Sequence, residues 1–258
     1  MKNNSASTEQ RVVTEQGDTI SPETPSLHPA EGVKAHPAGL EIVQAHLPND
    51  EYYAVSQRKQ QLVLHHTAGS HRPDWTIHGW NSDRLGRVAT AYLIGSISTS
   101  ITADYRDWDG KVVEAFPPEY WAQHLGVQSP NNERLNKASI GIELCNYGYV
   151  VKKRDGSFWS YVNRPVPKEQ VIDLGFEWRG YRWWHSYTDA QLEAARKLLL
   201  RLSEQFGIAL KKTWSVADFS VQQAALQGTT GVWTHCQFRS DKFDCYPHPA
   251  LLQMLNSL

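Results

Sequence analysis

Histidines stand at the ends of two predicted strands, where a rigid sheet can hold side chains facing an open cleft. His65 and His66 end the apolar run QQLVLHH, and His235 ends a second predicted strand, GVWTH. Asp244 and Cys245 follow a short loop later. Zinc hydrolases use three side-chain ligands of these types and leave a fourth position for water, whose pKa the metal lowers to about 7. These residue types in these places are therefore typical of a metal-dependent hydrolase.

Spacing by itself does not settle the ligand set. Neighbouring residues on a strand point to opposite faces, so only one of His65 and His66 can reach a metal. A single histidine at a strand end is more often structural than catalytic, and the sequence holds no HExxH motif. The residues alone thus make a metal hydrolase one hypothesis, and they leave the third ligand open between Asp244 and Cys245.

The elements that must position these residues follow a mixed pattern of strands and helices. The sequence predicts strands at 60–66, 87–97, 100–108, 111–116, 138–145 and 230–235, and helices at 74–85, 189–206 and 249–258. Thr188 with Gln191 is a capping box for the long helix, and Gly207 is its stop signal. Strands interleaved with helices favour an α+β (mixed α/β) fold, in which helices flank a central mixed β-sheet.

Composition allows one large domain with a packed core. The chain has 258 residues, of which 40% are hydrophobic, and it includes 10 Trp. Its formal net charge of -1 leaves no basic surplus to neutralise phosphates, so we expect no nucleic-acid partner. The three cysteines form no CxxC pair, which argues against a disulfide framework. No stretch approaches the ~20 apolar residues that span a bilayer.

The first part of the sequence differs in composition from the rest. Residues 1–38 hold four prolines and no aromatic residue, and they lack the apolar core of a secretory signal. Such a stretch cannot bury enough apolar surface to offset its ordering entropy, so we expect a flexible arm. The alternative is a docking tail for a delivery partner. We expect synthesis in the cytoplasm without a signal peptide, so a wall-directed protein would act after release or delivery.

Residues 147–187 are unusually aromatic, with four Trp and several Tyr among Lys and Arg. One interpretation is an extra hairpin and loop that cover the sheet. The other is a wall of a glycan groove, since aromatic faces stack on sugars and Arg donates to their oxygens. The sequence leaves both interpretations open.

Four motifs occur in a fixed order along the chain: LVLHHTAG at 62–69, WAQHLG at 121–126, SIGIELCN at 139–146 and THCQFRSDKFDCYP at 234–247. Together with YTDAQL before the last motif, they closely resemble the type 2 N-acetylmuramoyl-L-alanine amidases, relatives of peptidoglycan recognition proteins. The resemblance implies an amidase-like catalytic domain at 39–258, with 147–187 as an insertion. It also implies zinc-dependent cleavage of the amide bond between N-acetylmuramic acid and L-alanine in bacterial peptidoglycan.

The resemblance also implies which residues bind zinc. The first His of the LHHTAG-like motif is a ligand in this family, and it corresponds to His65. The His after the late strand is the second ligand, and it corresponds to His235. The third is an Asp or Cys with a Lys two residues ahead of it. Lys242 stands two residues before Asp244, so Asp244 is preferred and Cys245 is the alternative.

The remaining roles also come from the resemblance. Glu143 stands where several relatives carry a catalytic carboxylate, which can take a proton from the attacking water and pass it to the leaving amine. Lys242 would stabilise the developing oxyanion as a fixed positive charge. His124 would lie near the substrate, and Asn146 would hydrogen-bond the peptide stem. The alternatives are a solvent-facing Glu on a strand and a solvated surface Lys.

Two other functions remain compatible with the sequence. One is a non-catalytic peptidoglycan-binding module without a metal, and the other is a zinc peptidase that cuts within the stem peptide. All three ligand positions hold competent side chains, which favours an enzyme. The sequence also departs from the family, because many members carry a Tyr near the site where Thr90 stands here, with Tyr92 two residues later.

Overall fold

The computed structural model describes residues 39–210 and 213–258, and the arm expected at 1–38 lies outside this part of the chain. Its largest sheet has six strands in the order β1-β4-β3-β5-β2-β11. The strands are β1 (Ile42–Gln44), β4 (Val112–Glu114), β3 (Tyr92–Ile94), β5 (Ser139–Leu144), β2 (Gln61–His66) and β11 (Gly231–Thr234). All neighbours pair in parallel except β3 and β4, which are antiparallel. The sheet is therefore mixed, as the sequence predicts.

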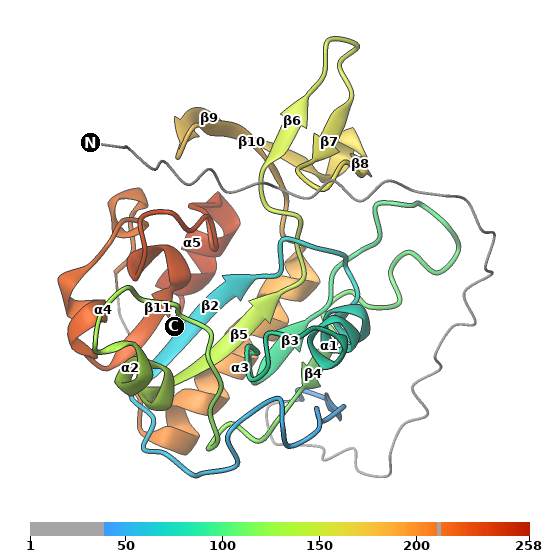
Figure 1. The fold of residues 1–258 in the computed structure, drawn as a ribbon. Helices are drawn as coiled ribbons and strands as arrows, with labels where there is room; N and C mark the ends of the chain where they lie inside the picture. Colours follow the sequence, from blue (N-terminus) through green and yellow to red (C-terminus); the bar gives the residue numbers. More distant parts are fainter. Residues whose placement is uncertain (1–38, 211–212) are drawn as a thin grey trace, which may run out of the picture.

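Helices lie on both sides of this sheet (Figure 1). They are α1 (Pro73–Ser82), α2 (Asn132–Ala138), α3 (Asp189–Phe206), α4 (Gln223–Gln227) and α5 (Pro249–Asn256), with 3₁₀ turns η1 (Lys168–Gln170), η2 (Val216–Asp218) and η3 (His235–Gln237). The predicted α+β fold class is confirmed. Within the part of the chain that the structure describes, no helix has both the length and the apolar character needed to cross a membrane.

Burial on both faces explains the apolar run in β2. Leu62 and Leu64 belong to the core cluster that holds the apolar side of α3, whereas Val63 belongs to a second cluster with Leu125 and Trp233. A strand with a packed layer on each face has no solvent side, so its sequence does not alternate. His65 is the next residue after Val63 on the same face, and His66 follows Leu64 on the other. The two histidines thus face different layers.

The long helix α3 has the predicted bounds because both ends carry strong local signals. The Thr188 hydroxyl accepts a hydrogen bond from the backbone N–H of Gln191 at 3.0 Å. At the other end, Gly207 adopts the left-handed conformation with φ 64°, which ends the helix. The buried stripe of α3 packs against the sheet and α5, as its periodicity predicts.

The strand predicted at 100–108 is wrong, because this segment forms turns. The backbone N–H of Asp107 donates to the carbonyl of Asp104, and that of Asp109 donates to the carbonyl of Arg106, each at 3.0 Å. Strand β4 therefore pairs antiparallel with β3 and not with this segment. The strand predicted at 87–97 shortens to Tyr92–Ile94.

Segment 147–187 forms two small sheets outside the main one (Figure 1). The first contains β6 (Val150–Lys152), β7 (Phe158–Ser160) and β8 (Pro165–Val166), and the second is the hairpin of β9 (Val171–Trp178) and β10 (Tyr181–His185). Trp184 is fully buried and stacks on Tyr246 with ring centroids 4.5 Å apart. This ring covers the body of the domain, as the first interpretation of the segment has it.

Candidate metal centre

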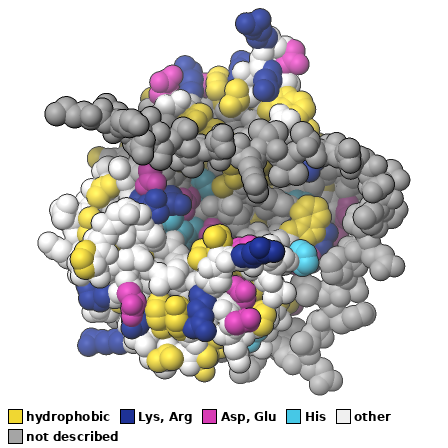
Figure 2. Space-filling model, in the orientation of Figure 1, with side chains coloured by type: hydrophobic (Ala, Val, Ile, Leu, Met, Phe, Trp, Pro, Cys, Tyr) yellow, Lys and Arg dark blue, Asp and Glu magenta, His cyan; other side chains and the backbone are white. Residues whose placement is uncertain are grey.

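Three parallel strands bring the ligand candidates to one edge of the sheet. Strands β2, β5 and β11 run in the same direction, so their carboxyl ends meet there. His65 lies at the end of β2, paired in register with Glu143 on β5. His235 follows directly after β11, and the chain returns to this edge at Asp244. Figure 2 shows histidine side chains beside basic and acidic ones in a hollow of the surface.

The three side chains converge on one point. Nδ1 of His65 lies 3.0 Å from Nδ1 of His235 and 3.1 Å from Oδ2 of Asp244. Nδ1 of His235 lies 2.8 Å from the same oxygen of Asp244. Zinc bound by nitrogen and oxygen at roughly 2.0–2.2 Å holds neighbouring tetrahedral ligands about 3.3 Å apart. The donor set and its spacing thus fit a zinc ion. Among the described residues, no other group of three or more His, Cys, Asp or Glu side chains converges in this way.

The neighbours of the ligand residues point elsewhere. His66 is buried on the opposite face of β2, where its Nδ1 lies 3.2 Å from the hydroxyl of Tyr187. The thiol of Cys245 is fully buried and is not part of the converging group, whereas the Asp244 side chain remains 13% exposed beside the histidines. The converging group therefore contains His65 and not His66, and Asp244 and not Cys245.

A chain of hydrogen bonds fixes the proton positions on both histidines. Nε2 of His235 lies 2.8 Å from the carbonyl of Leu125, which can only accept, so this nitrogen carries the proton. The other nitrogen, Nδ1, then presents its lone pair to the centre. Neutral imidazole in this tautomer is the form that binds a metal, and such outer contacts orient metal ligands.

The same reasoning holds for His65 through a longer chain. The Ser139 hydroxyl donates to the carbonyl of Leu135 at 2.7 Å, so it accepts from Nε2 of His124 at 2.8 Å. Nδ1 of His124 must then accept from Nε2 of His65 at 2.9 Å. The lone pair of His65 Nδ1 therefore faces the centre. Both ring nitrogens of His124 are used inside the protein, where they orient His65, and the expected substrate contact of His124 stays a prediction.

Charge states in the site suit a cation. Burial, together with the charge of His235, lowers the pKa of His65 to about 4, so its ring is neutral at pH 7. Burial by itself would raise the pKa of Asp244, but the two histidines outweigh it and hold this pKa well below its usual range. Asp244 is then an anion, and one carboxylate with two histidines is a common zinc ligand set.

Glu143 stands beside this group with an unused oxygen. Its Oε2 is buried and has no hydrogen-bond partner. Burial and the nearby Asp244 raise the pKa of Glu143 well above its usual range, while the positive charge of Lys242 acts in the opposite direction. A buried carboxyl with a raised pKa is a candidate for proton exchange in a reaction. Glu143 and Lys242 thus lie within electrostatic reach of Asp244 and of each other, and their catalytic roles stay predictions.

Asn146 lies elsewhere. Its side chain is fully buried, and its amide nitrogen donates to the carbonyls of His185 at 2.9 Å and Ser186 at 3.1 Å. Its amide oxygen accepts from the backbone N–H of Gly148 at 2.7 Å. These bonds tie the Asn146 side chain to the backbone of the insertion, and its expected contact with a peptide stem stays a prediction. Tyr92 also points away from the centre, since it is in register with Ile142 and donates to Glu114.

Sequence reasoning missed the supports of the ligands. Ser139, the carbonyl of Leu125 and the carbonyl of Leu135 complete the hydrogen-bond chains but carry no signal of their own. The available hint was the order of motifs, because WAQHLG holds His124 and Leu125 and SIGIEL begins with Ser139. Only the folded chain shows that these motifs meet behind the histidines.

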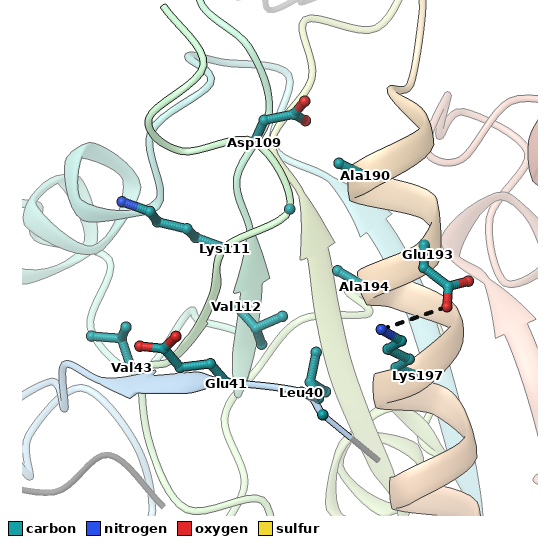
Figure 3. Close-up of a pocket in the computed structure, with 12 residues that line it drawn as sticks. Leu40, Glu41, Val43, Asp109, Lys111, Val112, Ala190, Glu193, Ala194 and Lys197 are labelled. Carbon is teal, nitrogen blue, oxygen red and sulfur yellow. Dashed lines mark ion pairs between the residues drawn. The ribbon is translucent and has the colours of Figure 1, made fainter. Parts of the chain in front are cut away.

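A separate cavity of 380 Å³ lies between α3, β4 and the start of β1 (Figure 3). It is lined by apolar atoms of Leu40, Val112 and Ala194 and by the ion pair of Lys197 with Glu193 at 3.7 Å. No residue of the converging group lines this cavity. The two charged α3 side chains in its lining, Lys197 and Glu193, pair with each other. The chemistry of the site therefore lies at the strand ends.

One comparison with known proteins identifies a family. The family model described as N-acetylmuramoyl-L-alanine amidase matches residues 56–247. A search of curated proteins found no match. Among solved structures, PlyL has a TM-score of 0.46 at 13% identity, covering 84% of this chain and 97% of PlyL. The E. coli amidase AmiD has a TM-score of 0.37 at 22% identity, and the match covers 61% of this chain and 48% of AmiD. The Staphylococcus aureus hydrolase AmiA has a TM-score of 0.45 at 13% identity, and the match covers 83% of this chain and 81% of AmiA.

Proposed function

Because the chain belongs to the N-acetylmuramoyl-L-alanine amidase family, we propose that it hydrolyses the amide bond between N-acetylmuramic acid and L-alanine in bacterial peptidoglycan. We propose zinc as the cofactor, with His65, His235 and Asp244 as its ligands. The observation that supports this function most directly is the convergence of these three side chains at the strand ends, with both histidines in the metal-binding tautomer.

A zinc ion held by His65, His235 and Asp244 would supply Lewis-acid chemistry, which favours attack by water on an amide carbonyl at neutral pH. The residues of the chain supply the rest. His65 and His235 are held in place from behind, through His124 and the Leu125 carbonyl. A ligand set fixed in this way needs little rearrangement when charge develops in the transition state.

Glu143 moves the proton in the proposed reaction. Its carboxylate takes a proton from the attacking water as the oxygen adds to the amide carbon, and it then gives that proton to the nitrogen of L-alanine as the C–N bond breaks. The unpaired Oε2 and the raised pKa of Glu143 support this role, since a group that exchanges protons needs a free oxygen and must hold a proton more tightly than an exposed carboxylate does. Lys242 supplies a positive charge to the developing oxyanion.

Digestion of purified peptidoglycan tests this function. We expect free stem peptides that begin with L-alanine, identified by mass spectrometry of the soluble products. Shorter peptides cut within the stem would instead assign a peptidase. Binding to the wall without release of any peptide, and without stoichiometric zinc, would assign a non-catalytic module. The Glu143→Gln variant serves as the matched control, because it keeps the fold and the ligands.

We further propose that residues 39–258 form the whole catalytic domain and that a partner or a release step brings the protein to the cell wall. The family match at 56–247 and the packed core from Leu40 to Leu255 support this boundary. A variant that lacks residues 1–38 should keep full activity on purified wall in a dye-release assay. A large loss of activity would show that these residues belong to the catalytic domain.

A further inference from the structure

Arg179 occupies a backbone position that disfavours its residue type. Strands β9 and β10 are joined by the two residues Arg179 and Gly180, with Trp178 and Tyr181 paired across the turn. Their φ angles are 52° and 83°, so both are left-handed, as in a type I′ hairpin turn. Such turns prefer Asn or Gly at the first position, because a Cβ is strained there. An Arg in this place costs stability, so its side chain must serve a purpose other than the turn.

The guanidinium of Arg179 donates to four backbone carbonyls of one distant loop. Nη2 donates to Cys236 at 3.1 Å. Nη1 donates to Ser240 at 2.7 Å, to Arg239 at 3.2 Å and to Lys242. Four carbonyl oxygens that point to one place repel each other, and a planar cation with several N–H donors offsets this repulsion.

This loop carries much of the proposed catalytic centre. It leaves β11 at His235 and returns to the centre at Asp244, and the backbone N–H of Cys236 donates to the carbonyl of Asp244 at 2.8 Å. The Arg179 guanidinium lies between these ends and holds the carbonyl of Lys242, two residues before Asp244. The position of the Asp244 carboxylate relative to the histidines thus depends on a loop that Arg179 draws together.

A second contact joins the same loop to the insertion. The ring of Phe243, between Lys242 and Asp244, packs on Tyr149 and Tyr181 with centroids 5.5 Å and 5.6 Å apart. These two tyrosines stack on each other at 3.6 Å. Hydrogen bonds from Arg179 therefore reach both ends of the loop, and aromatic packing adds to them at Phe243; both kinds of contact come from segment 147–187.

We propose that Arg179 is a positioning residue for the metal-binding loop, so that the insertion at 147–187 holds the proposed zinc ligand Asp244 in place. This inference rests on the proposed function, because it assumes that zinc binds between Asp244 and the two histidines. It assigns to the insertion a task that neither a sheet cover nor a glycan wall requires.

The Arg179→Gly variant separates positioning from a structural role. Glycine suits the type I′ turn better than arginine, so the melting temperature of the metal-free protein should stay the same or rise. Zinc affinity, measured by competition with a chelating dye, should fall by about 10- to 100-fold, as for other lost supports of metal ligands. The visible absorption of the cobalt-substituted protein should change as well, because it reports ligand geometry.

Two further variants complete the test. Arg179→Lys keeps the charge but not the planar fork, so it should recover only part of the zinc affinity. Arg182→Ala is the matched control, because Arg182 lies on the same hairpin but contacts Asp173, at 2.6 Å, and the ring of Trp183 instead of the metal-binding loop. It should bind zinc as the parent protein does.

Two results would overturn the proposal: unchanged zinc affinity and cobalt spectrum in Arg179→Gly, or a fall in zinc affinity matched by an equal loss of metal-free stability. The proposed function is judged separately on the parent protein. If the parent protein binds zinc but releases no L-alanine peptides, the amidase function is refuted and the positioning role of Arg179 is not. A parent that binds no zinc refutes both.

Discussion

Asp244 lies between two histidines whose lone pairs already face it. The carbonyls of Leu125 and Leu135 can only accept hydrogen bonds, and this fixes every proton along the two chains that end at His235 and His65. The site therefore needs no tautomer change when a cation enters. The remaining free-energy cost is that of holding three polar groups within 3.1 Å of one another in a buried place. A bound cation offsets this cost.

Zinc content should distinguish Asp244 from its neighbour. In Asp244→Ala the ligand oxygen is lost, and we expect zinc affinity to fall by more than the roughly 100-fold that loss of an outer support costs. In Cys245→Ser the zinc content should remain that of the parent, because the buried thiol lies outside the ligand group. Elemental analysis of the purified, dialysed variants measures both. Loss of zinc from Cys245→Ser alone would reverse the assignment.

Glu143→Gln should separate chemistry from metal binding. The amide has the shape of the carboxyl but cannot take up the proton of the attacking water, so kcat should fall about 100- to 10,000-fold. Zinc content and KM should change little, since Glu143 makes no hydrogen bond to the ligand residues. Steady-state kinetics on a defined muropeptide measures this. A kcat close to that of the parent would remove Glu143 from the mechanism.

At the scale of elements, Asn146 joins the end of β5 to the aromatic insertion. Asn146→Ala removes the side-chain partner of the Ser186 carbonyl and of the Gly148 N–H, and it leaves the His185 carbonyl with the Tyr246 hydroxyl alone. We expect the free energy of unfolding to fall by about 2–4 kcal/mol, while KM for a muropeptide stays constant. Urea unfolding with parallel kinetics measures both quantities. The exposed Asn131, changed to Ala, is a control that should leave stability unchanged. A rise in KM without a loss of stability would support the substrate contact.

The elements that the sequence predicts well are those with local signals at their ends. The cap at Thr188 and the stop at Gly207 define α3 without reference to the rest of the fold. Residues 100–108 show the opposite case, because their β-forming residues are outweighed by turn bonds among Asp104, Asp107 and their neighbours. Helix α2 was not predicted, since its seven residues are held by contacts of Leu135 and Asn136 with distant parts of the chain.

The ligands of the site could be predicted from the order of the motifs, but their supports could not. His65, His235 and Asp244 are named by the resemblance and are brought together by the fold. Ser139 reaches His124, 15 residues away in sequence, because parallel pairing places β5 beside β2. Arg179 reaches Arg239, 60 residues away, because the hairpin of β9 and β10 presents it to that loop. A pattern along the chain does not record which carbonyl a side chain meets in space.

At the scale of the whole molecule, parallel strands explain why the site lies where it does. The carboxyl ends of β2, β5 and β11 meet at one edge, and each contributes a functional side chain or leads directly to one. The layer on the α3 side instead buries His66, Tyr187 and other polar groups in the core. The same alternation that aims His65 at the centre thus places several neutral histidines inside the protein.

These buried histidines make stability depend on pH. His185 is 1% exposed, and burial, followed by the charges of His66 and His71, lowers its pKa from 6.5 to about 3. Below pH 6.5 the unfolded chain takes up a proton that the folded protein does not, so stability falls as the pH falls towards 3. Between pH 7 and pH 5 this one group should cost about 2 kcal/mol of unfolding free energy.

Urea unfolding of the metal-free protein at pH 7 and pH 5 measures this loss, and His185→Gln identifies its source. The glutamine oxygen can still accept the hydrogen bond from the backbone N–H of Tyr147, which His185 Nδ1 accepts at 3.2 Å. The variant has no proton to gain in this range. Its free energy of unfolding should therefore change less between pH 7 and pH 5 than that of the parent, by about 2 kcal/mol. His248, whose pKa burial lowers to about 4, still titrates in both proteins and accounts for part of what remains. An equal pH dependence in parent and variant would mean that His185 is hydrated or already protonated in the folded protein.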